Sequence, residues 1–151
     1  YNKKKTIIEC AESLGVKIND IQEAMLFHNI KISKDKYIIF LNGNVGAGKT
    51  SFVKSYLSST KAAASVTSPT FTIINEYKAD SKIIYHYDFY RLKNKKELFE
   101  IGIDYYFDQP GIHFVEWSIE FLEFLPKPNL TINFIILPKS RIIKAEIYDK
   151  K

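Results

Sequence analysis

Short apolar runs alternate with helical patterns along most of this chain. Residues 37–41 (YIIFL) and 112–115 (IHFV) are apolar at almost every position, which is typical of strands covered on both faces of a sheet. The other predicted strands are 71–77, 82–87, 130–137 and 142–148, and the predicted helices are about 49–57, 95–101 and 119–125. Strands that alternate with helices and then end in a hairpin predict an α/β fold with a sheet of mixed direction.

The N-terminal part follows a different pattern. Residues 6–31 are mostly helical in spacing, with Asn19 as the predicted N-cap and apolar residues at near-helical intervals after it. No repeat, low-complexity segment or Pro/Gly/Ser-rich linker divides the chain. We therefore expect a helical extension at 1–36, packed on a single domain at 37–151.

Composition limits the class of protein. The chain has 151 residues, of which 46% are apolar and 26% charged, as expected for one folded domain. Cys10 is the single cysteine, so no disulfide can form within the chain, and no apolar run approaches the ~20 residues of a membrane span. We expect a cytoplasmic protein with neither a membrane nor a DNA partner. The net charge of +5 is compatible with RNA, and it is also common among proteins that bind no polyanion.

The strongest motif is a glycine-rich segment between the strand at 37–41 and the helix that begins near Lys49. Residues 43–50 read GNVGAGKT and match the pattern G-x-x-x-x-G-K-[ST] without a mismatch. The N–H groups of such a loop wrap phosphate oxygens, and the helix adds the positive end of its dipole. Lys49 supplies charge to the β- and γ-phosphates, and Thr50 offers a hydroxyl to Mg²⁺. The segment predicts a P-loop that binds a nucleotide.

Two acids directly follow apolar strands. Asp88 ends the run IIYHYD, and Glu116 ends the run IHFVE. Ligands of α/β folds bind where such strands end. One acid could hold Mg²⁺ and the other could orient or deprotonate an attacking water, and the residues alone leave the two roles open.

A hydroxyl-rich loop precedes the strand predicted at 71–77. Residues 66–70 (VTSPT) place three hydroxyls around Pro69. Such a loop could sense a γ-phosphate, as switch loops do, and an ordinary turn is the alternative.

The order of motifs along the chain resembles one known family. After the P-loop come T-S-P-T-F at 67–71, N-E-Y at 75–77, Y-H-Y-D-F-Y-R-L at 85–92, E-L at 97–98, I-G at 101–102, V-E-W at 115–117 and L-P at 125–126. Together these blocks resemble the TsaE family over roughly residues 37–148, whereas the first 35 or so residues match poorly. The P-loop is shared by many families, and the T-S-P-T-F, H-x-D-x-Y-R and V-E-W blocks are much more specific.

The resemblance implies a small ATPase of the pathway that makes threonylcarbamoyl-adenosine in tRNA, acting with the proteins TsaD and TsaB. It implies that Thr50 and Glu116 hold Mg²⁺, and that Asp88 lies near the γ-phosphate and is needed for hydrolysis. It also implies a switch role for the T-S-P-T segment.

Three further nucleotide contacts follow from the same resemblance. Trp117 is similar to a family residue beside the nucleotide, and Arg141, in the C-terminal hairpin, is similar to a family arginine near it. Asn19 is the best match to the family residue that helps hold the base.

These inferences combine into one prediction: a P-loop NTPase-like single domain of the α/β class, with a mixed sheet flanked by helices and a C-terminal hairpin. It would bind ATP and Mg²⁺ and hydrolyse ATP slowly, using Asp88 and Lys49 in catalysis, with Lys49 exposed on the loop. Thr50 and Glu116 are the predicted metal ligands. The predicted nucleotide contacts are Asn44, Val45, Gly46, Ala47, Gly48, Lys49, Thr50, Ser51, Thr67, Thr70, Trp117, Arg141 and Asn19.

Two other functions fit parts of the sequence. A small P-loop kinase needs a lid of arginines over the phosphates, and Arg91 and Arg141 are the only arginines in the chain. The basic charge mildly favours a non-catalytic, nucleotide-dependent RNA-binding module, and it is also compatible with a weak or indirect tRNA contact.

His86 lies between two tyrosines in a strand and is expected to be structural.

Overall fold

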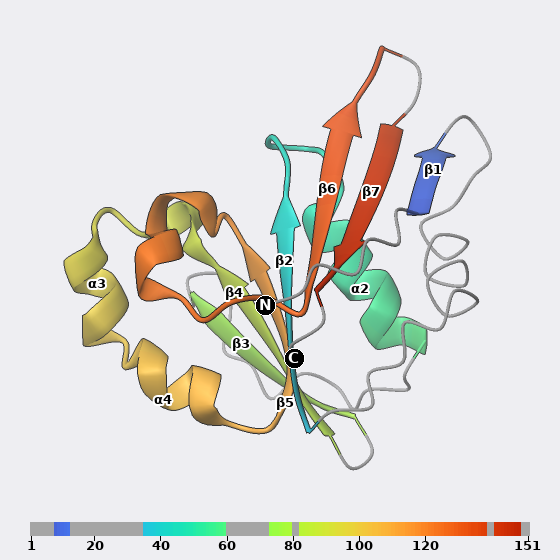
Figure 1. Ribbon diagram of the computed structural model, residues 1–151. Helices are drawn as coiled ribbons and strands as arrows, with labels where there is room; N and C mark the ends of the chain where they lie inside the picture. Colours follow the sequence, from blue (N-terminus) through green and yellow to red (C-terminus); the bar gives the residue numbers. More distant parts are fainter. Residues whose placement is uncertain (1–7, 13–34, 60–72, 80–81, 139–140, 149–151) are drawn as a thin grey trace.

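A seven-stranded sheet with the order β1-β7-β6-β2-β5-β4-β3 forms the centre of the structure (Figure 1). The computed structural model describes residues 8–12, 35–59, 73–79, 82–138 and 141–148. The strands are β1 (Ile8–Glu12), β2 (Lys36–Asn42), β3 (Ile74–Ala79), β4 (Lys82–Asp88), β5 (Gly111–Glu116), β6 (Leu130–Ile136) and β7 (Arg141–Ile147). The α-helices are α2 (Lys49–Ser59), α3 (Lys95–Glu100) and α4 (Ile103–Asp108), and the 3₁₀ helices are η1 (Phe89–Arg91) and η2 (Ile119–Phe124).

The middle of the sheet is parallel and both of its sides are antiparallel. β2 runs parallel to its neighbours β5 and β6, and β4 runs parallel to β5. β3 pairs antiparallel with β4, β7 with β6, and β1 with β7. The mixed sheet and the C-terminal hairpin are therefore confirmed. Because β2, β4 and β5 share one direction, their carboxyl ends meet at one edge, where α/β folds bind ligands.

Two apolar layers cover opposite faces of the sheet. Along β2, Tyr37, Ile39 and Leu41 belong to the layer that includes α2, whereas Ile38 and Phe40 belong to the layer of α3 and α4. Figure 1 shows α2 on one side of the sheet and α3 and α4 on the other. This arrangement explains why β2 has an unbroken apolar run, since alternate side chains are buried on both faces.

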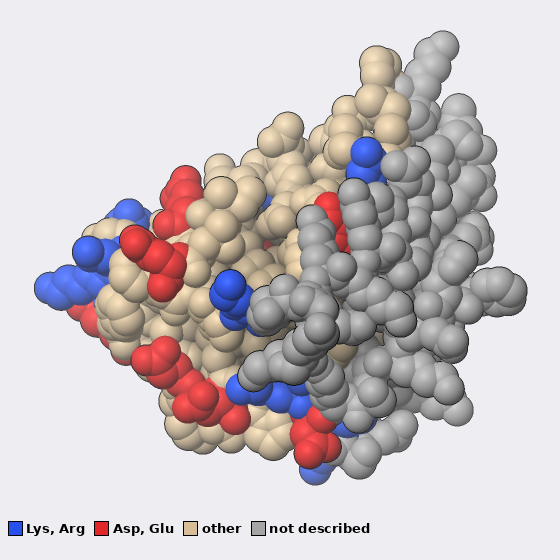
Figure 2. Space-filling model, viewed as in Figure 1, with Lys and Arg blue, Asp and Glu red and all other residues tan. Residues whose placement is uncertain are grey.

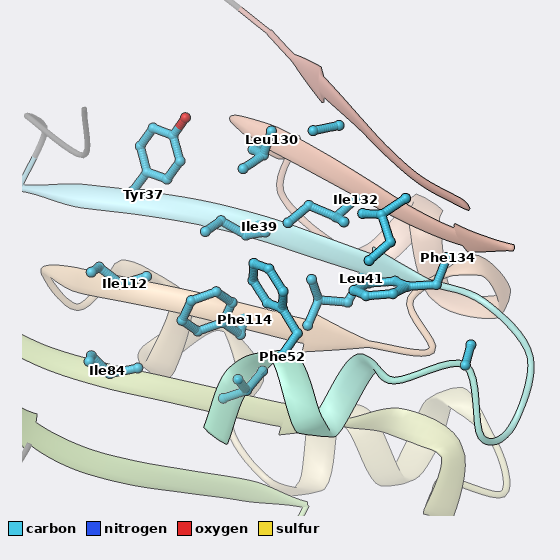
Figure 3. Close-up of a cluster of buried hydrophobic side chains, with 14 of the residues drawn as sticks. Tyr37, Ile39, Leu41, Phe52, Ile84, Ile112, Phe114, Leu130, Ile132 and Phe134 are labelled. Atoms are coloured by element: carbon cyan, nitrogen blue, oxygen red, sulfur yellow. The ribbon is translucent and has the colours of Figure 1, made fainter. Parts of the chain in front are cut away.

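Aromatic packing fixes α2 against the sheet. The ring of Phe52 lies 6.4 Å from that of Phe114 on β5 and 5.9 Å from that of Phe134 on β6, both in edge-to-face geometry. Figure 3 shows Phe52 entering the cluster of side chains from β2, β5 and β6. Tyr56, one turn later, packs on Phe114 at 5.2 Å. These contacts hold the start of α2, and with it Lys49 and Thr50, at the edge where β2, β4 and β5 end.

On the opposite face, His113 anchors α4. It is fully buried, stacks on Tyr85 at a centroid distance of 4.6 Å, and shares a 2.6 Å hydrogen bond with the Tyr87 hydroxyl through Nδ1. Its Nε2 bonds to the Gln109 carbonyl at 2.9 Å, and Phe107 of α4 stacks on Tyr87 at 4.5 Å. Burial lowers the pKa of His113 to about 4, so the ring is neutral at pH 7, with Nε2 as donor and Nδ1 as acceptor.

The expected helix at 6–31 is wrong for residues 8–12. These residues form β1, whose backbone pairs with β7 from Ile8 opposite Ala145 to Glu12 opposite Arg141. An open strand edge offers backbone hydrogen bonds that a local helical pattern does not reveal. Residues 1–7 and 13–34 lie outside the described part of the chain, so the expected helical extension at 1–36 stays a prediction for these residues alone.

Smaller differences concern the region between β4 and β6. The sequence pattern did not predict α4, whose residues IDYYFD are rich in aromatic side chains with modest helix propensity. The helix predicted at 119–125 is the 3₁₀ helix η2. β3 begins at Ile74 instead of residue 71, and residues 71–72 lie outside the described part.

Candidate nucleotide-binding site

The glycine-rich loop joins β2 to α2, as the motif predicts. Gly46 and Gly48 have φ angles of 79° and 106°, which strongly favour glycine. A Cβ on Gly43 would lie 2.8 Å from the Phe134 carbonyl oxygen, so the loop passes closer to β6 than any side chain allows. Phe52 N–H donates to the Gly48 carbonyl at 2.9 Å, which starts the helix directly at the end of the loop.

Lys49 is buried, which differs from the exposed loop lysine that the sequence led us to expect. Only 4% of the residue is exposed, because its ammonium group folds back to donate to the Gly43 carbonyl and lies 3.3 Å from the centroid of the Trp117 ring. Burial lowers the pKa of Lys49, and the nearby charges of Glu116 and Asp88 oppose that shift. The lysine is thus held inside the loop, beside the acids at the strand ends.

Asp88 and Glu116 are direct neighbours at the carboxyl ends of β4 and β5. They face each other in the register of this parallel pair, and both follow the alternation that points toward α2. Glu116 is 2% exposed, and the single proton of the Thr50 hydroxyl is shared between its two carboxylate oxygens, each 3.0 Å from Oγ1. Asp88 is half-buried and accepts from the Tyr90 N–H at 3.2 Å, which caps η1. The two acids therefore have different surroundings.

His86 also reaches this group, although the sequence suggested only a structural role. It lies two residues before Asp88 on β4, is 7% exposed, and bonds through Nε2 to Oε2 of Glu116. The alternation of side chains along β4 could have indicated this contact, because His86 and Asp88 are two residues apart and must face the same side of the sheet.

One pocket of about 250 Å³ brings most of the predicted residues together. Its lining is Val45, Gly46, Ala47, Gly48, Lys49, Thr50, Ser51, Asp88, Tyr90, Glu116 and Trp117. Tyr90 was not predicted; its exposed ring lies 4.8 Å from that of Trp117 and extends the aromatic wall of the pocket. Trp117 has a φ of 63°, an unusual conformation for a bulky residue that turns its ring over Lys49.

The remaining predicted residues are not in this lining. Asn44 lines a neighbouring cavity of about 300 Å³, together with Gly43, Lys49 and Trp117. Arg141 begins β7, where its backbone pairs with Ile136, and its side chain lies outside the described part. Asn19, Thr67 and Thr70 also lie outside it, so their predicted contacts with a nucleotide stay predictions.

The donor set suits a phosphate-bound magnesium ion. The Thr50 hydroxyl and the Glu116 carboxylate are hard oxygen donors held side by side. Among the described residues, no group of three or more His, Cys, Asp and Glu side chains forms a metal cage. Mg²⁺ is commonly bound by one or two protein oxygens together with phosphates and water, so these two residues fit such a site.

Comparison with known proteins agrees with the motifs. The sequence profile of the family described as "Threonylcarbamoyl adenosine biosynthesis protein TsaE" matches residues 3–143. The chain belongs to the TsaE family. The match corrects the expected extent of the resemblance, because it begins near the N-terminus instead of near residue 37. TsaE proteins act in tRNA threonylcarbamoyladenosine biosynthesis, and their fold is of the P-loop type.

Individual TsaE relatives support the assignment. The TsaE protein of Haemophilus influenzae is 36% identical over 116 residues, which are 76% of this chain and 73% of that protein. The TsaE protein of Bacillus subtilis is 40% identical over 95 residues, 63% of this chain and 59% of that protein, so this alignment spans less than two thirds of the relative. The crystal structure of Bacillus subtilis YdiB superposes with a TM-score of 0.69 at 26% identity, covering 98% of this chain and 90% of YdiB.

No helix in the described residues is long and apolar enough to cross a membrane.

Proposed function

We propose that this chain binds ATP with Mg²⁺ and hydrolyses it slowly, as the ATPase component of the tRNA threonylcarbamoyladenosine assembly, acting with TsaD and TsaB. The observation that carries the proposal is the convergence of Lys49, Thr50, Asp88 and Glu116 on one pocket at the carboxyl ends of β2, β4 and β5. Membership of the TsaE family supplies the biological context.

The loop and Lys49 bind the phosphates of the nucleotide. The loop at residues 43–48 leads directly into α2, where the helix dipole favours negative charge and backbone N–H groups can bind phosphate oxygens. The Lys49 ammonium group exchanges the Gly43 carbonyl and the Trp117 ring for phosphate oxygens. Since the lysine is buried, its charge acts at reduced dielectric and contributes more than a surface lysine would.

Thr50 and Glu116 would hold Mg²⁺, which when bound would supply positive charge to the phosphates. Asp88 is left to orient the attacking water. It is more exposed than Glu116 and lies on the same pocket, and its described hydrogen bond is to the backbone of Tyr90. The water oxygen attacks the γ-phosphorus, the bond to the β–γ bridging oxygen breaks, and the products are ADP and inorganic phosphate.

Slow hydrolysis follows from the shortage of positive charge around the γ-phosphate. Among the described residues of the pocket, Lys49 is the only cation. Lys54 and Arg91 line a neighbouring cavity, which shares Thr50 and Asp88 with this pocket. Phosphoryl transfer is fast only when extra cations stabilise the transition state, so we expect a weak intrinsic rate.

The direct test is nucleotide binding by Lys49→Ala. Removing the ammonium group should weaken Mg²⁺–ATP binding by at least about 10-fold, because a charge-assisted contact with phosphate is lost. Calorimetry with ADP and with a non-hydrolysable ATP analogue measures the effect, and circular dichroism checks that the variant is folded. Equal affinities in the folded variant and the wild type would contradict the assignment of the pocket.

A further inference from the structure

His86 is a buried polar side chain whose contact with Glu116 the proposed reaction does not yet use. Its Nε2 bonds to Oε2 of Glu116, and both residues are almost completely buried. An ionised carboxylate only accepts hydrogen bonds, so the ring must carry its proton on Nε2 and donate it. The contact is therefore directional: His86 donates to one specified oxygen of the carboxylate.

The two oxygens of Glu116 are held unequally. Oε1 accepts from the Thr50 hydroxyl, whereas Oε2 accepts from both Thr50 and His86. Thr50 donates to both oxygens at 3.0 Å, so Thr50 does not select one orientation of the carboxylate. His86 does, because it binds Oε2 from the strand beside it, and it leaves Oε1 with more unused acceptor capacity.

The position of His86 follows from the sheet. In the β4–β5 register His86 is opposite Phe114, and Asp88 is opposite Glu116. His86 is therefore a diagonal neighbour of Glu116, two residues before the position directly opposite it. Both side chains lie on the face that α2 covers. Residues on neighbouring β-strands place the two side chains more rigidly than a loop would.

We propose that His86 is a positioning residue that fixes the orientation in which Glu116 meets the metal–nucleotide complex. This inference rests on the proposed function, since it assumes that Glu116 is a ligand of Mg²⁺. Groups that hydrogen-bond a metal ligand from behind set its orientation, and their loss typically weakens metal affinity by 10–100-fold. Without His86, Glu116 would be a buried carboxylate with Thr50 as its one described donor, and it would turn toward other partners.

A purely structural role predicts a different result. A histidine that only fills space would, when replaced, change stability and affect nucleotide binding equally with and without metal. His113 is a suitable control because it is also buried, on the neighbouring strand, yet it bonds to Tyr87 and Gln109 on the opposite face. His113→Gln should lower stability without changing the dependence of binding on Mg²⁺.

The experiment measures ADP affinity by calorimetry over a Mg²⁺ series and in EDTA, which gives an apparent Mg²⁺ affinity without any turnover. His86→Leu removes the donor at similar volume, and we expect its apparent Mg²⁺ affinity to fall 10–100-fold while ADP affinity in EDTA changes little. His86→Gln, whose amide nitrogen reaches about as far as Nε2, should retain most of the wild-type value. His86→Asn, which is shorter, should resemble His86→Leu.

The outcomes separate the inference from the function on which it rests. Wild-type protein that does not bind ADP, or binds it equally with and without Mg²⁺, would contradict the proposed function itself. Mg²⁺-dependent binding in wild type with an unchanged apparent Mg²⁺ affinity in His86→Leu would overturn the role of His86. If His86→Leu does not fold, the pair His86→Gln and His86→Asn decides, and equal apparent Mg²⁺ affinities in that pair would overturn it equally.

Discussion

Glu116 shows how strongly the site depends on the hydrogen bonds of one buried side chain. It is 2% exposed, and its carboxylate is held by a hydroxyl from α2 and an imidazole from β4. A buried carboxylate is tolerated only with such partners, because an unpaired one loses its hydration without compensation. Asp88, one strand away in direct register, is half-buried and is bonded to a backbone N–H of η1. The two neighbouring acids therefore have different surroundings, which is consistent with the different roles proposed for them.

We predict that replacing the two acids separates binding from hydrolysis. Glu116→Ala should weaken Mg²⁺-dependent nucleotide binding by about 10-fold or more, because a metal ligand acts in the ground state. Asp88→Ala should bind Mg²⁺–ATP almost normally and lose at least about 100-fold in hydrolysis, because positioning water matters mainly in the transition state. Calorimetry with Mg²⁺ measures nucleotide binding by each variant, and a phosphate-release assay measures hydrolysis. The opposite pattern would mean that the two roles are exchanged.

Secondary-structure elements with strong local signals were predictable, and those defined by distant partners were not. β2 and β5 have unbroken apolar runs because both of their faces are buried, and the P-loop links β2 to α2 through a motif that dictates its own geometry. β1 forms through pairing with β7, more than 120 residues away along the chain, and no local pattern records that pairing. α4 contains aromatic residues that local propensity does not assign to a helix.

The same reasoning applies to the site residues. The convergence of Lys49, Thr50, Asp88 and Glu116 on one pocket was predictable from a motif and from the position of the acids at strand ends. The burial of Lys49 was not, because it results from the Gly43 carbonyl and from the Trp117 ring, which the unusual backbone of Trp117 places there. The contact of His86 with Glu116 depends on the register between β4 and β5, which the sequence of either strand alone does not specify.

At the scale of elements, we predict that His113 makes the attachment of α4 sensitive to acid. The folded-state pKa of His113 is lowered to about 4, whereas the unfolded value is about 6.5, so the unfolded chain binds an extra proton between these values. The contribution of neutral His113 to the free energy of unfolding is fully present above pH 6.5. It decreases as the pH falls toward 4, by up to about 3 kcal/mol.

The control for this prediction is His113→Gln, which can donate to the Gln109 carbonyl and accept from Tyr87 without titrating. Urea unfolding at pH 7, 5.5 and 4.5 gives the free energy of unfolding of both proteins. We expect the free energy of unfolding of the wild type to exceed that of His113→Gln at pH 7, and we expect this difference to decrease as the pH falls. Parallel pH profiles would show that His113 does not contribute this dependence.

On the scale of the whole molecule, charge is unevenly distributed over the described surface. Figure 2 shows acidic side chains over α4 and both basic and acidic side chains over α3, in a chain with a net charge of +5. The acids of these two helices are Glu97, Glu100, Asp104 and Asp108. α3 also carries Lys95 and Lys96, which balance its two acids, whereas α4 carries acids only. We therefore do not expect tRNA phosphates to approach the molecule over α4.

The last prediction concerns how partner proteins act on the pocket. The described lining supplies a glycine-rich loop, two acids and one buried lysine, which is the only cation among these lining residues. A partner that contributes an arginine, or that orders a loop beside the pocket, would complete the transition-state stabilisation without changing the fold. We therefore expect TsaD and TsaB together to accelerate phosphate release by at least about 10-fold over the chain alone. The measurement is a phosphate-release assay at saturating ATP, with Asp88→Ala as the control that should stay slow in the presence of both partners. A high rate in the isolated chain that the partners leave unchanged would mean that the pocket is already complete and that hydrolysis is regulated elsewhere.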